Sequence, residues 1–153
     1  LWSKEKIFKK INYMKKNNLQ ISHTSYEIIS EEGLILGTRK SRSFNDYKNI
    51  LTSCDIGLSS VLLKKDLITE DIKFANLKTK EDFVLWLKIL KSGYEIGALD
   101  EPLMLWRKTK GSLSSSIFQK LKDGFKVYNY YMNYNFIKSM FLLIILSINY
   151  LKK

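Results

Sequence analysis

The chain has 153 residues, of which 45% are hydrophobic and 27% charged, and its formal net charge at pH 7 is +11. These values are ordinary for one globular domain with a sizeable core. The single cysteine, Cys54, excludes an internal disulfide and is typical of a reducing compartment. The single histidine, His23, has no cysteine nearby and makes a poor metal site.

The first third of the chain is typical of a helix followed by two strands. Residues 3–17 are predicted to form a helix capped by Ser3. Its apolar residues recur with helical spacing at Ile7, Ile11 and Met14. Residues 20–30 and 34–38 are typical of strands joined by a turn. Because the chain opens on Leu1 rather than Met, we expect a fragment that lacks its own N-terminal part.

The middle of the chain alternates between helical and extended patterns. A short helix is predicted near 47–51 and a buried strand at 57–63. A helix at 81–90 then precedes two extended segments at 94–99 and 103–107. Strands and helices therefore interleave, which predicts the α/β or the α+β class.

Glu81 and Asp82 form an acidic pair at the start of the 81–90 helix. Bulky apolar residues follow at once, with a buried stripe predicted at Phe83, Leu87 and Leu90. Carboxylates at the mouth of a well-anchored helix are held rigidly, as catalytic carboxylates must be. The alternative is a capping box, in which Thr79 caps the helix and Asp82 closes the box.

Two helices are predicted at the C-terminal end, at 116–132 and 136–151. The second contains the apolar run 140–146, which is shorter than the about 20 residues that span a bilayer. Tyrosines before this run and Lys152-Lys153 after it suit a helix in a membrane interface. Packing on the domain or on a partner is the alternative.

The positive charge is concentrated in this last third. From Met104 onward nine basic residues accompany one acidic residue, Asp123, so that this third carries a charge of +8. Such a surface suits anionic lipid, nucleic acid or a phosphate-bearing small molecule, and a solvated lysine-rich face is the bland alternative. No basic recognition helix is present in the sequence, so we expect no nucleic-acid partner.

Five segments, in order, resemble bacterial family 2 glycosyltransferases. The acidic pair and the Leu85-Trp86-Leu87 run resemble the family's ED motif. Leu105-Trp106-Arg107 and the loop 111–115 resemble its tyrosine–arginine strand and its serine loop, although Trp106 stands where Tyr is usual. The other three segments resemble the stretch after the family's DxD metal motif and two of its strands, and they are Trp2 with Glu5-Lys6, Ile21–Tyr26 and Ile56–Val61.

The resemblance implies a partial GT-A fold of the α/β class, a mixed sheet flanked by helices with further helices at the C-terminus. Residues 1–116 would be the acceptor side of the transferase domain, and 117–153 a helical extension in contact with the membrane. The implied reaction is inverting transfer of a sugar from a nucleotide diphosphate sugar to a hydroxyl of a glycan or lipid-linked acceptor. It would serve cell-surface polysaccharide synthesis in the cytoplasm, at the inner face of the cell membrane.

The resemblance also implies a divalent metal, Mg or Mn, held mainly by DxD carboxylates upstream of Leu1, with no metal ligand assigned within the chain. The nucleotide-binding strands would lie upstream as well. We therefore expect the 153-residue chain alone to be inactive. The alternative function is a non-catalytic basic module that binds membrane or polysaccharide.

Catalytic roles are implied for the acidic pair. An acceptor hydroxyl must lose its proton as it attacks, and Asp82 is the expected base. Glu81 would orient Asp82 or hold an acceptor hydroxyl. A helix N-terminus favours the ionised form that a base requires.

Substrate-binding roles are implied for four further residues. Trp86, one turn along the helix, would stack on a sugar face unless it belongs to the core. Arg107 and Lys110 flank a loop that would close over the leaving diphosphate, and Ser112 lies within that loop. A structural ion pair with Glu101 or a neighbour is the alternative for Arg107.

Overall fold

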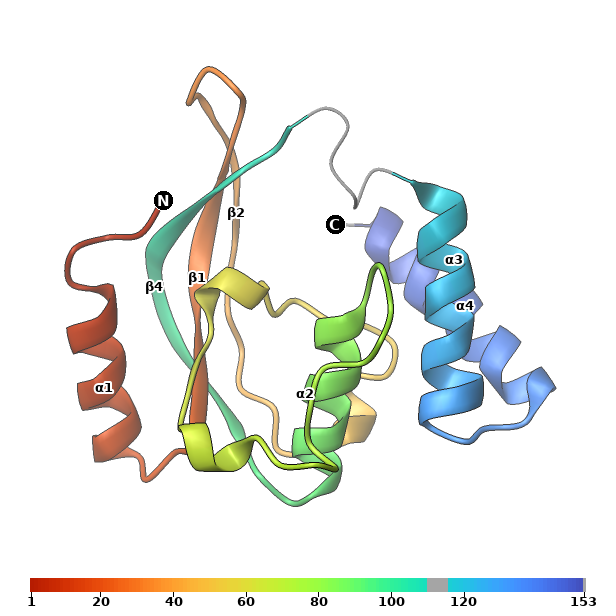
Figure 1. The fold of residues 1–153 in the computed structure, drawn as a ribbon. Helices are drawn as coiled ribbons and strands as arrows, with labels where there is room; N and C mark the ends of the chain where they lie inside the picture. The colour runs from red at the N-terminus through yellow and green to blue at the C-terminus, as the bar shows by residue number, and fades with distance from the viewer. Residues whose placement is uncertain (110–115, 153) are drawn as a thin grey trace.

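The structure is a computed structural model that describes residues 1–109 and 116–152. A four-stranded mixed sheet forms its centre (Figure 1). The strands are β1 (Ile21–Ile29), β2 (Ile35–Arg39), β3 (Leu62–Leu63) and β4 (Ile96–Arg107). β1 pairs antiparallel with β2 and β3 and parallel with β4. The α/β class with a mixed sheet is therefore confirmed, and it is compatible with a partial GT-A fold.

Helices flank the sheet and continue beyond it. α1 covers one side of the sheet and α2 the other, while α3 and α4 lie together beyond α2 (Figure 1). The helices are α1 (Lys6–Lys16), α2 (Glu81–Lys91), α3 (Ile117–Lys126), a π-helical turn η5 (Val127–Tyr131) and α4 (Phe136–Leu151). Three short 3-10 turns, η1 (Tyr47–Asn49), η2 (Leu58–Ser60) and η3 (Lys65–Leu67), connect the strands.

α2 forms the centre of the hydrophobic core. Seven of its eleven residues are buried, including the predicted stripe of Phe83, Leu87 and Leu90. It ends at Ser92, and Gly93 follows with a φ of 86°, the left-handed conformation that glycine adopts readily after a helix. Buried residues of α2 belong to one core cluster with residues of β1, η5 and α4.

The predicted inward face of α1 is wrong. Ile7 and Ile11 are about 40% exposed, whereas Lys6 and Lys10 are buried together with Met14. The Lys10 ammonium donates to the Ser22 carbonyl at 3.1 Å and to that of Ser60, and Lys6 donates to Ser59. These carbonyls satisfy the buried ammonium groups while the lysine stems fill the space beneath the helix.

Two predicted extended segments also differ. The segment 57–63 is mainly the turn η2, with only β3 as strand, because Lys6 and Lys10 bind its carbonyls. The segments 94–99 and 103–107 instead form one strand, β4, whose register against β1 shifts around Pro102. Proline is accommodated there because such an irregularity leaves ladder positions unpaired.

The two C-terminal helices present one face to the core and another outward. Leu142, Leu143 and Leu146 of α4 belong to the same core cluster as α2. The opposite side of α4 exposes apolar side chains at Phe136, Ile137, Phe141, Ile144 and Ile148. No helix in the described ranges is both long and apolar enough to cross a membrane. The division at residues 116 and 117 stays a prediction.

Candidate active site

Asp82 lines a cavity of about 510 Å³ at the start of α2. The segment 53–56 and the residues just before α2 form one side of this cavity, and α3 and α4 form the other. Asp82 is half-buried there, whereas Glu81 is not among the lining residues. The structure therefore places the two members of the acidic pair in different surroundings.

The environment of Asp82 changes its acidity. Burial, and next the nearby charge of Glu81, raise the pKa of Asp82 to about 6. The Phe83 amide opposes this effect by donating to Asp82 Oδ1 at 2.7 Å. The carboxylate is thus ionised above about pH 6 and can still accept a proton near neutrality, which suits a general base.

The capping-box alternative is wrong. α2 begins after Lys80, which has a left-handed backbone (φ 62°) and makes no side-chain capping bond. Thr79 instead directs its amide and its hydroxyl to Asp123 Oδ2 of α3, at 2.9 and 3.0 Å. Because the Thr79 hydroxyl is bound to α3, it is not the cap of α2, and Asp82 serves the adjacent Phe83 amide.

Two lysines that the sequence reasoning missed line the same cavity. They are Lys80, immediately before α2, and Lys120 of α3. Burial lowers the pKa of Lys80, although the nearby Cys54 and Asp82 oppose this effect. Lys120 lies over the ring of Tyr150, 5.3 Å from its centroid. The positive φ of Lys80 cannot be read from sequence, and Lys120 belongs to a chain rich in lysine.

Cys54 also lines the cavity but is not a reactive thiol. Burial, followed by the charge of Asp82, raises its pKa to about 12. A thiol with such a pKa stays protonated at neutral pH and is a poor nucleophile.

Trp86 and Arg107 lie outside this cavity. Trp86 is fully buried in the core, so it offers no exposed face to a sugar in this conformation. Arg107 donates to the carbonyls of Ser30, at 3.1 Å, and of Glu31 in the β1–β2 turn. Glu101, the first partner suggested for Arg107, pairs instead with Lys9 at 2.8 Å.

The substrate-binding roles suggested for these residues stay predictions. Lys110 and Ser112, the other two residues expected to bind substrate, lie outside the described residues. The roles of Asp82 and Glu81 stay predictions as well, although the structure gives Asp82 a cavity that a substrate could enter.

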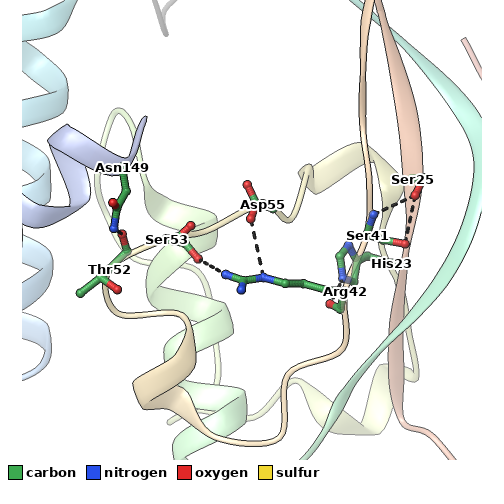
Figure 2. A network of polar contacts seen from close by, with 8 residues as sticks. All are labelled: His23, Ser25, Ser41, Arg42, Thr52, Ser53, Asp55 and Asn149. Carbon is green, nitrogen blue, oxygen red and sulfur yellow. Dashed lines mark hydrogen bonds and ion pairs between the residues drawn. The ribbon is translucent and has the colours of Figure 1, made fainter. Parts of the chain in front are cut away.

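A polar network supports the wall of the cavity opposite α3 (Figure 2). The Nε2 atom of His23, in β1, lies 2.9 Å from the Arg42 carbonyl oxygen. The Arg42 guanidinium reaches Asp55 at 3.7 Å and donates to the Ser53 carbonyl at 3.3 Å. Asn149 of α4 donates to the carbonyl of Thr52 at 3.0 Å. The segment that carries Ser53 and Cys54 is thereby fixed between the sheet and α4.

The described residues do not fit a resident metal ion. No group of three or more His, Cys, Asp or Glu side chains within them could hold one. Asp82 and Glu81 are a pair without a third ligand of this kind, so no chemistry of a metal is assigned to the cavity.

Comparison with known proteins finds similarity to named bacterial glycosyltransferases. No family model matches the chain. TuaG of Bacillus subtilis is 26% identical over 99% of this chain and 60% of its own length. It carries a provisional name as a glycosyltransferase of teichuronic acid biosynthesis. WfgD of Escherichia coli, named a UDP-Glc:α-D-GlcNAc-diphosphoundecaprenol β-1,3-glucosyltransferase, is 31% identical over 83% of this chain and 49% of its own length.

A third relative, WfaP of Escherichia coli, is named for the same activity as WfgD. It is 29% identical over 78% of this chain and 47% of its own length. All three relatives are named glycosyltransferases of bacteria, and the chain is similar to them over 78–99% of its own length. The resemblance found in the sequence is confirmed at this level. The chain spans 47–60% of the length of these three relatives, so the activity of a whole glycosyltransferase is a proposal for it.

Proposed function

We propose that this glycosyltransferase chain forms the acceptor side of a family 2, GT-A-type enzyme in which Asp82 is the general base. The observation that carries the proposal is the position of Asp82 in a cavity, with a pKa raised to about 6, in a relative of named glycosyltransferases. The full reaction would transfer a sugar from a nucleotide diphosphate sugar to a hydroxyl of a glycan or lipid-linked acceptor.

In such a transfer this chain would carry out one proton transfer, from the acceptor hydroxyl to Asp82. The acceptor oxygen forms a bond to the anomeric carbon while the bond from that carbon to the diphosphate oxygen breaks, which inverts the configuration. The acceptor hydroxyl loses its proton in the same step, and the Asp82 carboxylate takes it. The hydrogen bonds between Thr79 and Asp123 would hold the start of α2, and with it the Asp82 carboxylate, in place. Rigid positioning of the base lowers the barrier.

The donor would be bound by residues outside this chain. The resemblance implies Mg or Mn on a DxD motif, and the described residues form no cluster that could replace it. We therefore propose that the 153-residue chain alone neither binds a nucleotide sugar nor transfers sugar. Metal-dependent binding of UDP-glucose to this chain, measured by calorimetry, would contradict that part of the proposal.

We further propose that the enzyme works at the inner face of the cell membrane. The exposed apolar face of α4 and the basic C-terminal third support contact with an anionic lipid surface. A lipid-linked acceptor would then be reached without leaving the membrane. A basic binding module without catalysis is the second candidate function, supported by the same charge and by the same exposed helix face.

The decisive experiment compares Asp82→Asn with Asp71→Asn in the full-length protein, in a sugar-transfer assay. Asp71 is exposed and lies outside the cavity, so it controls for the loss of one carboxylate. We expect Asp82→Asn to reduce turnover by roughly 10²–10⁴-fold and Asp71→Asn to leave it nearly unchanged. Near-normal turnover of Asp82→Asn would contradict the proposal, and absence of transfer by the parent protein would favour the binding module.

A further inference from the structure

The cavity that Asp82 lines combines an apolar lining with two lysines. Leu121 of α3 and Leu143, Leu146 and Tyr150 of α4 supply apolar walls. Lys80 and Lys120 bring two ammonium groups to the same cavity, and neither forms an ion pair with any residue in the described ranges. Asp82 acts on Lys80 through its charge, and Lys120 lies over the Tyr150 ring. An anion that enters the cavity would stabilise both half-buried ammonium groups further.

The cavity is continuous with the outer surface of α3 and α4. Ile117, Leu121, Tyr150 and Leu151 line it and are also exposed, by 41% to 83% of their accessible surface. Further exposed apolar residues continue along α4, at Ile144 and Ile148. An apolar chain could therefore pass from the cavity to this outer face without crossing a polar region.

We propose that the cavity holds the diphosphate and the first isoprene units of a polyprenyl-diphosphate-linked acceptor, an inference that rests on the proposed function. Lys80 and Lys120 bind the diphosphate, and the leucines of α3 and α4 contact the first isoprene units. The sugar attached to the other end of the diphosphate presents its hydroxyl to Asp82. The rest of the polyprenyl chain continues along the exposed face of α4.

The charges of the site fit this occupant. Two lysines and one carboxylate, Asp82, line the cavity. In the proposed complex the two ammonium groups would face the diphosphate, and Asp82 would face a neutral sugar hydroxyl. A polar acceptor without a hydrocarbon chain would leave the apolar walls without a contact. A hydrocarbon alone would leave both ammonium groups without an ion pair. A volume of about 510 Å³ lies within the range of small-molecule sites, so the cavity accommodates the head and the first units rather than a whole polyprenyl chain.

The named activities of two relatives agree with this chemistry. WfgD and WfaP are both named for a GlcNAc-diphosphoundecaprenol acceptor, a sugar joined to a polyprenyl chain through a diphosphate. Neither name says which part of the protein contacts the lipid. Of two cavities that the described residues line, only the cavity at the start of α2 combines apolar walls, Asp82 and the two lysines.

The test is calorimetric binding of soluble probes to the 153-residue chain. The probes are farnesyl diphosphate, inorganic diphosphate, farnesol and dihexanoyl phosphatidic acid. We expect farnesyl diphosphate to bind roughly tenfold or more tightly than each of the other three, because only it supplies both the diphosphate and the isoprene units. Equal binding of dihexanoyl phosphatidic acid would indicate a general lipid surface and overturn the inference.

Matched variants on α3 separate the cavity from its surroundings. Leu121→Glu should weaken farnesyl diphosphate binding by about tenfold or more, whereas Phe118→Glu, also exposed but outside the cavity lining, should change it less than about threefold. Lys120→Gln should weaken binding and Lys122→Gln should not, since Lys122 does not line the cavity. Equal effects within either pair would overturn the inference.

A labelling experiment on the unmodified chain removes any dependence on how variants fold. A photoreactive benzophenone analogue of farnesyl diphosphate should label the segments 117–121 and 143–151, and excess farnesyl diphosphate should prevent this labelling. Labelling confined to other segments would overturn the inference. If transfer requires Asp82 but farnesyl diphosphate does not bind, the proposed function stands and this inference falls. If farnesyl diphosphate binds selectively but Asp82→Asn retains normal turnover, the cavity assignment stands and the proposed role of Asp82 falls.

Discussion

Thr79 and Asp123 join the start of α2 to α3 through two hydrogen bonds to one carboxylate oxygen. The Thr79 amide donates to Asp123 Oδ2 at 2.9 Å and its hydroxyl at 3.0 Å, and Gln119 Nε2 donates to the same atom at 2.8 Å. Asp123 is 2% exposed. This carboxylate therefore fixes two walls of the cavity that contains Asp82.

Replacing Asp123 should destabilise the chain. Asp123→Ala removes three hydrogen bonds and leaves the buried Thr79 amide and hydroxyl unpaired, so we expect the free energy of unfolding to fall by about 1–3 kcal/mol at pH 7. Urea unfolding measures the change. Asp66→Ala, at an exposed position, is the control, and an equal loss in both variants would contradict the structural role.

The same carboxylate predicts acid sensitivity. Burial alone would raise the pKa of Asp123, but hydrogen bonds from Gln119 and Thr79 hold it below its ordinary value. A depressed pKa in the folded state contributes stability above the ordinary pKa, and this contribution is lost as the pH falls through the folded-state pKa. The difference in stability between the parent chain and Asp123→Ala should therefore shrink at low pH. A constant difference would contradict this assignment.

Asp82 is expected to have the opposite effect on stability. Its pKa is raised to about 6 in the folded chain, so the folded state favours the protonated form. The associated stability is present below the ordinary pKa of about 4 and is lost as the pH rises through about 6. Asp82→Asn should therefore be more stable than the parent at pH 8, by about 1–3 kcal/mol, and similar at pH 4.

Urea unfolding of the Asp82 variant at both pH values checks this prediction, with Asp71→Asn as the matched control. A variant that is more stable but does not transfer sugar would mark Asp82 as a group held for its chemistry. Loss of stability in Asp82→Asn at pH 8 would instead indicate a structural role for the carboxylate.

Lys10 is expected to make stability depend on pH in the alkaline range. Burial, followed by the charge of Lys6, lowers its pKa to about 7. The folded chain thus loses this proton near pH 7 and the unfolded chain only near pH 10, so this group makes stability increase between these values. Lys10→Met should lack that increase, which we expect to be about 1–2 kcal/mol between pH 7 and 9.

The comparison needs a control on the same helix. Lys15→Met, at an exposed position of α1, should keep the parent's pH dependence in urea unfolding. The parent's change from pH 7 to 9 is compared with that of each variant, so that contributions of other titrating groups cancel. Identical pH dependence in the parent and in Lys10→Met would contradict the assignment.

Substitutions on the outer face of α4 test whether this face contacts the membrane. Phe141 and Ile137 are 61% and 80% exposed there, and a glutamate at each should oppose insertion and repel anionic lipid. We expect the double variant Ile137→Glu, Phe141→Glu to lose most of its co-sedimentation with anionic vesicles at both low and high salt. Leu34→Glu, at an exposed apolar position of the β1–β2 turn, should retain it.

Salt separates the two contributions to this binding. The basic C-terminal third contributes vesicle binding that weakens at high salt, because charges are screened beyond about 10 Å at 0.1 M salt. The apolar face of α4 contributes vesicle binding that does not weaken at high salt. Since Leu142, Leu143 and Leu146 of α4 belong to the core, point substitutions on the outer face test membrane contact more cleanly than removal of the helix. Equal co-sedimentation of the double variant and the parent would show that this face does not contact lipid.

The sequence by itself determined the elements whose pattern is local. Apolar spacing predicted α2, a strand-like composition predicted β1, and a continuous apolar run predicted α4. Each of these signals depends only on which side chains follow one another. The acidic pair at the start of α2 is visible for the same reason, and with the other segments it resembles the glycosyltransferases to which the chain is similar.

The tertiary structure decided which groups meet. The inward face of α1 contains Lys6 and Lys10 because carbonyls of distant residues accept their protons. Thr79 binds Asp123 rather than capping α2, and Arg107 binds the β1–β2 turn rather than Glu101. Each choice depends on a partner far away in sequence, since a buried polar group is stable only where the fold supplies its hydrogen bond, and no local pattern records that partner.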